Sequence, residues 1–225
     1  MIKNTVRKFS GRHLSVASYP IVINSYGRSG STVLTNSIIE SSIKNRILFR
    51  KLTSRSISHD IWNLEKPMLQ EGIIYKTHSY PPTQIENTSV RMIYTFADPV
   101  DVIFSLLKRR EEKGEHWMKN HYNHLGVKYD NFDIINNDQL KLEKHLDSWL
   151  DETRIPIAFV KYENMWEYQK EISKFLGFRI QLPPHKKRKV SKEKSDNNIR
   201  RQIKITYSSL INKVNNLDNF KTNVT

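Results

Sequence analysis

The stretch that most constrains this chain runs from Pro20 to Thr35 and reads PIVINSYGRSGSTVLT. It opens with the apolar run Ile21-Val22-Ile23, which is typical of a buried parallel strand. A loop with two glycines, small hydroxyl residues and one arginine follows. Apolar residues then recur at helical spacing, at Val33, Leu34, Ile38 and Ile39. A strand, a glycine loop and a helix in this order point several backbone N–H groups at one anion. The stretch therefore predicts a site for phosphate or phosphosulfate.

The loop departs from the Walker A motif of nucleoside triphosphatases. That motif, G-x-x-x-x-G-K-[ST], would place glycine at position 25 and lysine at position 31, where this chain has Ser25 and Ser31. The loop's cation comes earlier, at Arg28. Because triphosphatases use the motif's lysine on the transferring phosphates, the loop argues against that chemistry. An ordinary strand-to-helix turn with serine at the N-cap remains the alternative.

Charge and composition narrow the classes of function. The net charge is +14, from 37 Lys+Arg against 23 Asp+Glu, which indicates an anionic partner such as a nucleotide, a nucleic acid, a sulfated substrate or a membrane surface. The absence of cysteine excludes disulfides, a thiolate nucleophile and a cysteine metal site. Residues 1–18 lack the apolar core of a secretory signal, and no run approaches a membrane span, so a cytoplasmic protein is expected.

Strands and helices are predicted to alternate along one domain, residues 1–225, with a basic arm at 1–19 and a basic loop and final helix at 183–225. Strands are expected at 21–25, 72–76, 90–96 and 157–161, with an edge strand in the arm as a fifth. Helices are expected at 31–43, 59–64, 99–113, 139–150, after 162–164 up to Gly177, and at 195–214. Residues 115–138 are expected to be irregular helix and loop that form a lid on the acceptor side, and the last residues to fray. The pattern predicts an α/β fold, a mostly parallel β-sheet of about four to five strands flanked by helices, around a P-loop-like nucleotide-binding core.

Four segments follow predicted strand ends, where ligands bind in open parallel sheets. They are the loop Y-G-R-S-G-S-T from Tyr26, the strand end K-T-H from Lys76, the turn I-Y-T-F-A-D-P-V-D-V-I-F-S ending at Ser105, and V-K-Y-E-N from Val160. Together they resemble the sulfotransferase family that uses 3'-phosphoadenosine 5'-phosphosulfate (PAPS). In order, they are similar to that family's phosphosulfate loop, catalytic strand end, 3'-phosphate motif and adenine-side segment. The resemblance covers roughly residues 21–177.

The resemblance implies in-line transfer of a sulfuryl group from PAPS to a hydroxyl or amine of a small-molecule or glycan acceptor, with adenosine 3',5'-bisphosphate (PAP) as product and no metal. His78 would be the general base, and Arg28 and Lys76 would balance charge on the leaving nucleotide. The donor would be bound by residues of all four segments and of a late basic run: Tyr26, Gly27, Arg28, Ser29, Gly30, Ser31, Thr32, Ser105, Tyr162, Lys186, Lys187 and Arg188.

One position departs from the family pattern. The 3'-phosphate motif has an arginine eight residues before its serine, where this chain has Ala97. Three explanations are open: the run from Lys186 to Lys189 supplies the charge, which we favour; Arg109 or Arg110 supplies it; or the donor lacks a 3'-phosphate or the protein is weak or inactive.

Two other classes of function remain as alternatives. A P-loop kinase of small molecules would need a Walker lysine and an aspartate that holds a metal at a strand end. A non-enzymatic nucleic-acid binder would account for the net charge of +14 and the late basic run, but the chain has no recognisable motif for reading nucleic acid. No specific nucleic-acid partner is therefore expected. The acceptor and the oligomeric state are not predicted.

Overall fold

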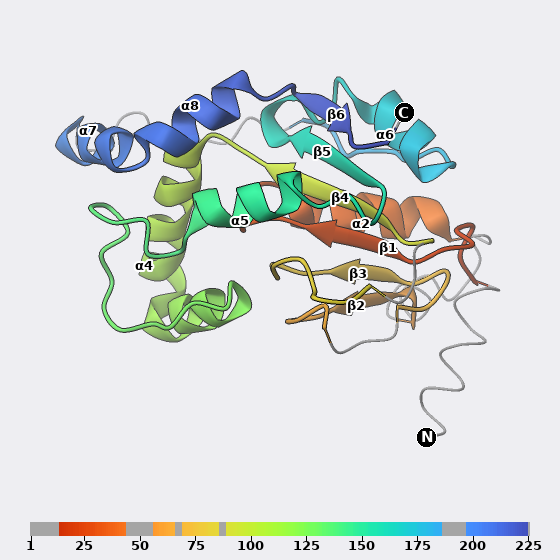
Figure 1. Ribbon diagram of the computed structural model, residues 1–225, viewed down its shortest axis with the longest axis horizontal. Helices are drawn as coiled ribbons and strands as arrows, with labels where there is room; N and C mark the ends of the chain where they lie inside the picture. Colours follow the sequence, from red (N-terminus) through yellow and green to blue (C-terminus); the bar gives the residue numbers. More distant parts are fainter. Residues whose placement is uncertain (1–13, 44–55, 66–68, 86–88, 186–196, 225) are drawn as a thin grey trace.

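The computed structural model describes residues 14–43, 56–65, 69–85, 89–185 and 197–224. Within them lies a six-stranded sheet of order β2-β3-β1-β4-β5-β6 (Figure 1). Neighbouring strands pair in parallel except β5 and β6, which are antiparallel. The strands span Ser58–Asp60 (β2), Ile74–Lys76 (β3), Ile21–Asn24 (β1), Arg91–Phe96 (β4), Ile157–Lys161 (β5) and Phe220–Thr222 (β6). The predicted mostly parallel α/β fold is therefore confirmed.

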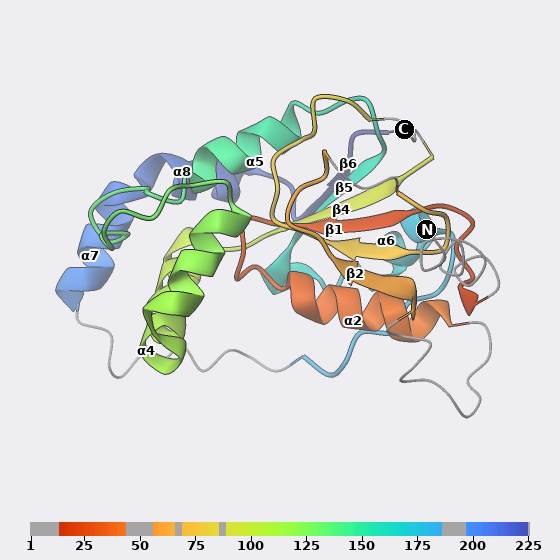
Figure 2. The same cartoon turned by 90° about the horizontal axis from the view of Figure 1, so that it is seen from below.

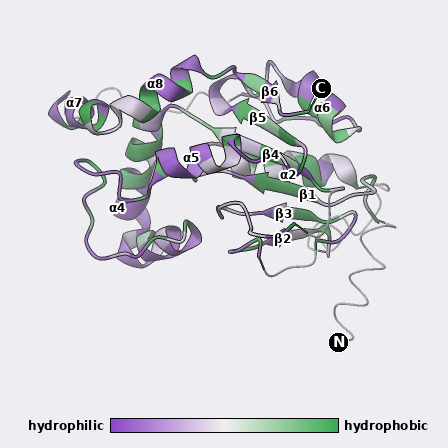
Figure 3. Cartoon of the chain, viewed as in Figure 1, coloured by the Kyte–Doolittle hydropathy of each residue, from purple (hydrophilic) through white to green (hydrophobic). Residues whose placement is uncertain are grey.

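Helices cover both faces of the sheet, so its central strands are buried on both sides. Figure 2 shows α2 on one side of the sheet and α5 on the other, with α4 extending from one end. The central strands are apolar, whereas much of α4 and the segment after it is hydrophilic (Figure 3). The helices span Ser31–Ser42 (α2), Pro99–His124 (α4), Leu142–Leu150 (α5), Tyr162–Asn164 (η1, a 3-10 turn), Gln169–Leu176 (α6), Asn197–Thr206 (α7) and Ser208–Asn216 (α8). Among the described residues, no helix is both long and apolar enough to cross a membrane.

The sheet has more strands than the four to five that were predicted, because two short edge strands were missed. β2 occupies part of 59–64, where a helix was expected, and β6 forms where the last residues were expected to fray. Both of those predictions are wrong. Each strand has three half-exposed or exposed residues held by backbone pairing to one neighbour, so neither contains the apolar run by which a strand is recognised. The expected edge strand of the N-terminal arm lies mostly outside the described residues; Ser15 makes one isolated bridge with Ile43.

Two helical predictions also need correction. The helix that starts at Pro99 does not end at residue 113: α4 breaks at Gly114 (φ 76°, ψ −179°) and then resumes to His124. The polar composition of 115–124 predicted only irregular helix and loop, whereas this second half is regular helix with the buried side chains Met118, His121 and Tyr122. The final helix is two helices, α7 and α8, which meet at Tyr207. By contrast, Gly177 ends α6 in the left-handed conformation, as predicted.

Candidate functional site

The loop after β1 is clamped between two aromatic rings. Gly27 and Gly30 have φ values of 91° and 86°, in the region that glycine adopts without strain. A Cβ atom at Gly27 would collide with the imidazole of His121, and one at Gly30 would collide with the ring of Tyr162. Glycine is therefore required at both positions for conformation and for space. The loop backbone is held close to α4 on one side and to the turn after β5 on the other.

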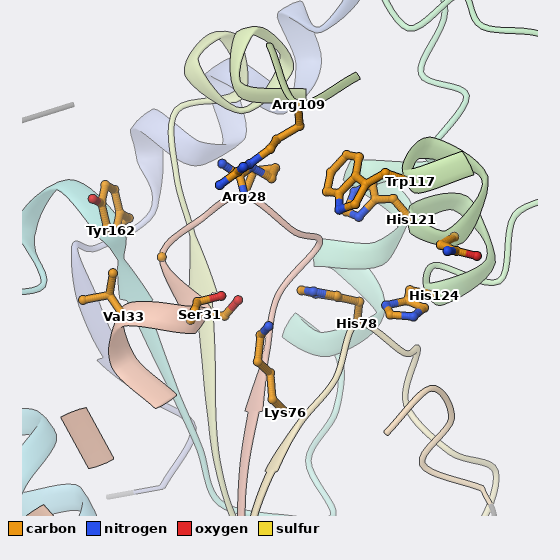
Figure 4. A pocket seen from close by; sticks show the side chains of 13 residues that line it. Arg28, Ser31, Val33, Lys76, His78, Arg109, Trp117, His121, His124 and Tyr162 are labelled. Carbon is orange, nitrogen blue, oxygen red and sulfur yellow. The ribbon is translucent and has the colours of Figure 1, made fainter. Parts of the chain in front are cut away.

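The loop leads into the N-terminus of α2, which faces a pocket of about 430 Å³ (Figure 4). The N-cap residue, Gly30, has no side chain to bond the first backbone N–H groups of the helix. Such groups, together with the helix dipole, favour an anion. The predicted site residues that line this pocket are Arg28, Gly30, Ser31, Thr32, Lys76, His78 and Tyr162. Arg109 also lines the pocket. Together with Arg28 and Lys76 it gives three cations, and no carboxylate is among the described lining residues.

Arg28 occupies the loop at a conformational cost. Its φ of 56° is left-handed, which costs a non-glycine residue about 1–2 kcal/mol. Arg28 Nε donates a hydrogen bond to Ser105 Oγ of α4 at 2.8 Å, and Figure 4 shows Arg28 and Arg109 at the same end of the pocket. Two arginines and a serine hydroxyl therefore gather where the first turns of α4 meet the loop.

His78 is held in one tautomer by the loop. Its Nδ1 lies 2.7 Å from the carbonyl oxygen of Ser25, and 3.2 Å from Ser25 Oγ. A carbonyl oxygen only accepts, so Nδ1 carries the proton and Nε2 keeps its lone pair. Burial is the main cause that holds the pKa of His78 well below its usual value, and the nearby His121, Lys76 and His145 act in the same direction. His78 is therefore a neutral imidazole at physiological pH, with Nε2 as a base.

A buried network supports the backbone that carries His78. His145 is fully buried, and its Nε2 lies 3.0 Å from the carbonyl of His78 and 3.1 Å from that of Ser79. Since both carbonyls accept, Nε2 carries the proton and Nδ1 accepts from the hydroxyl of Tyr94 at 2.8 Å. Trp149 Nε1 also donates to the Ser79 carbonyl at 2.9 Å. These bonds fix the strand end that carries His78.

This network predicts a loss of stability in mild acid. Burial lowers the pKa of His145 to about 4 in the folded protein, against about 6.5 when unfolded. The unfolded state therefore binds more protons, and the stability is fully present above about pH 6.5 and is lost as pH falls toward about 4, with a total on the order of 3 kcal/mol. In urea unfolding between about pH 6.5 and pH 5, His145→Gln should flatten the pH dependence of the free energy of unfolding. The exposed His116→Gln is the control; equal slopes in wild type and His145→Gln would contradict the assignment.

The second half of α4 forms a wall of the pocket, and none of its residues was among the predicted site residues. Four residues of this half follow one another at helical spacing and line the pocket: Trp117, Asn120, His121 and His124. The ring centroids of His78 lie 5.9 Å from those of His121 and 6.2 Å from those of His124. The spacing W-x-x-N-H-x-x-H at positions 117–124 indicates one face of a helix, but without an apolar stripe it predicted only irregular helix and loop.

Other residues that were predicted to bind the nucleotide lie outside the pocket. Tyr26 is fully buried below the loop, and its hydroxyl donates to the carbonyl of Ala97 and accepts from its N–H. Ser29 is also buried and donates to the carbonyl of Thr95. We therefore assign both a supporting role. Ser105 contacts the site through the hydrogen bond that it accepts from Arg28. The backbone of Gly27 contacts the ring of His121, which lines the pocket. Lys186, Lys187 and Arg188, together with the rest of the late basic run to Lys189, lie outside the described residues.

Comparison with known proteins gives a likeness in structure and none in sequence. No protein-family model matches the chain, and no curated protein matches it in sequence. Among solved structures, the chain is similar to a mouse sulfotransferase complexed with PAP, at 15% identity and a TM-score of 0.42, over 91% of this chain and 69% of that one. At this TM-score the likeness does not establish a family, so the site has to be assigned from its own residues.

Proposed function

We propose that this protein transfers a sulfuryl group from PAPS to a hydroxyl or amine acceptor. The observation that carries the proposal is the neutral His78, whose Nε2 is available as a base beside a glycine loop and three cations. In the reaction the acceptor oxygen or nitrogen forms a bond to sulfur, and the bond between sulfur and the bridging phosphate oxygen breaks. The acceptor's proton passes to His78 Nε2, and PAP leaves with the electron pair of the broken bond.

The loop suits the phosphosulfate end of such a donor. Gly27 and Gly30 bring the backbone close to the pocket, and the uncapped N-terminus of α2 offers N–H groups from Ser31 and Thr32. PAPS supplies an activated sulfuryl group whose leaving phosphate carries growing negative charge. Lys76, from the end of β3, and Arg28 lie in the same pocket and would stabilise that charge.

The 3'-phosphate would be bound without the residue that the family pattern requires. Ala97 is fully buried and its backbone is bonded to Tyr26, so position 97 presents no side chain to a ligand. A cationic corner is present instead where the first turns of α4 meet the loop. It consists of Arg28, Arg109 and the hydroxyl of Ser105. Of the explanations considered for Ala97, this arrangement favours Arg109. Arg109 also pairs with Glu112, at 3.0 Å, but it lines the pocket. Arg110 pairs with Glu115, lies over the ring of Phe132 and is not among the described lining residues.

Calorimetric titration with PAP, beside AMP and ADP with and without Mg²⁺, tests the proposal. PAP should bind more tightly than AMP, and Arg109→Ala should weaken PAP about 10- to 100-fold while leaving AMP unchanged, because a charge-assisted hydrogen bond contributes about 1.5–3 kcal/mol and about 1.4 kcal/mol is a factor of ten. Lys108→Ala removes the same charge from the neighbouring residue, which is exposed and lies outside the described pocket lining, and should have no effect. Equal binding of PAP and AMP would contradict the 3'-phosphate site, and tight binding of ADP that needs Mg²⁺ would favour a kinase.

A further inference from the structure

One buried polar atom in the pocket wall has no role in the chemistry proposed so far. His121 is 6% exposed, and its Nε2 has no hydrogen-bond partner among the described residues. The ring lies against the backbone of Gly27, and it stacks on Trp117 with a centroid distance of 5.3 Å and an interplanar angle of 7°. These contacts fix the ring on both sides, so the unpartnered nitrogen is held in place.

The surroundings of His121 keep it neutral. Burial, together with the positive charges or partial charges of His124, Arg28 and Lys76, lowers its pKa to about 3, and His78 is the other titratable ring that faces it. A neutral imidazole has one N–H donor and one lone pair. A buried polar group without a partner costs about 1–3 kcal/mol, and buried groups of this kind are normally satisfied by protein, water or ligand. In a pocket rich in cations, the partner that fits is an oxygen of an anion.

The position of His121 decides which part of the donor it would meet. Tyr162 covers the loop at Gly30, whereas His121 covers it at Gly27 and lies on the same side as His78. The group in transfer must lie within reach of the acceptor atom that His78 deprotonates. The His121 end of the loop is therefore the end where the sulfuryl group, and not the nucleoside, would lie.

We propose that His121 Nε2–H donates a hydrogen bond to an oxygen of the sulfuryl group during transfer. This inference rests on the proposed function. His121 would orient the group and stabilise charge on its oxygens without giving up a proton, while His78 alone accepts the proton of the acceptor. A fixed donor of this kind costs no reorganisation during reaction.

Comparison of PAP with PAPS, which differ by the sulfuryl group, provides the test. In ¹⁵N NMR of the histidine rings, assigned from through-bond correlations in the wild-type protein, PAPS should shift the His121 Nε2 resonance well beyond the shift that PAP produces. The backbone amides of Gly27 and Gly30 report donor binding independently. If both ligands move these amides but the His121 resonance is the same with PAP and PAPS, this inference is overturned and the proposed function stands. If neither ligand moves the amides, the proposed function fails, and this inference fails with it.

Kinetics give a second readout. His121→Phe keeps a stacked ring but removes both nitrogens, and it should lower kcat by about 100-fold, as does loss of one oxyanion donor, with the Kd of PAP unchanged. His121→Gln, whose side-chain amide can donate, should recover part of the rate. His116→Phe alters an exposed histidine of the same helix and serves as control. Unchanged kcat in a folded His121→Phe would overturn the proposal; if that variant does not fold, the NMR comparison in the wild-type protein still decides.

Discussion

Replacement of His78 by alanine is expected to lower kcat by about 100- to 10,000-fold, the range that general-base catalysis contributes, and to leave the affinity for PAP nearly unchanged. The reason is geometric: Ser25 holds Nδ1 in the protonated form and leaves Nε2 as the base, while the loop that would bind the donor keeps its own contacts. Single-turnover transfer to an acceptor identified by screening, together with calorimetric titration of PAP, separates the two effects.

Two further measurements sharpen this prediction. Because His78 has a pKa well below its usual value, wild-type kcat should stay level as the pH falls through about 6.5 and decline only in stronger acid. Free imidazole should restore part of the activity of His78→Ala, because it can replace the missing base. The matched control is His116→Ala, which removes an exposed histidine of α4. Full turnover by a folded His78→Ala would remove His78 from the mechanism.

The second large effect is expected at Gly30. Alanine at this position would be strained at φ 86° and would collide with Tyr162. Overpacking and backbone strain each cost about 1–3 kcal/mol, and about 1.4 kcal/mol is a factor of ten, so Gly30→Ala should weaken PAP binding on the order of 100-fold. The backbone N–H groups at the start of α2 would move with the loop. Calorimetry with PAP and thermal unfolding measure the loss of binding and of stability.

Gly126→Ala is a close control for Gly30→Ala. Gly126 is also left-handed, at φ 65°, but nothing lies within 4 Å of a Cβ added there. It should show the cost of backbone strain alone and leave PAP binding intact. Adding Tyr162→Ala to Gly30→Ala should recover the part of the stability loss that comes from the collision, as a double-mutant cycle would reveal. If Gly30→Ala and Gly126→Ala behave alike, the close approach of Tyr162 to the loop does not matter for binding.

Much of the fold could be read from the sequence because its central strands are apolar and its loops carry glycine and proline. Ile157–Lys161 is the strand that was predicted, and α2 ends one residue before its predicted end. Short edge strands such as β2 and β6 could not be predicted, since pairing with a neighbour forms them and their own residues carry no pattern. The helix from Pro99 was expected to end in the charged residues just before Gly114, although the chain turns there and continues as helix.

The site was predictable where it depends on strand ends, and not where it depends on tertiary packing. The loop, Lys76 and His78 follow strands, so their meeting at one edge of a parallel sheet could be expected. The placement of Arg28 at Ser105, the bonding of Tyr26 to Ala97 and the wall from α4 arise from contacts between distant segments. No local pattern shows such contacts. The predictions for Lys186, Lys187 and Arg188 lie outside the described residues.

The break in α4 at Gly114 separates two groups of pocket-lining residues along the chain. The loop, His78 and the cationic corner come from segments that also build the sheet and the first half of α4, whereas Trp117, Asn120, His121 and His124 belong to one short stretch beyond the break. A combinatorial library confined to positions 117, 120 and 124 would therefore diversify one wall while leaving the core untouched. For the transfer proposed above, such a library is expected to change which acceptors are used without rebuilding the rest of the molecule.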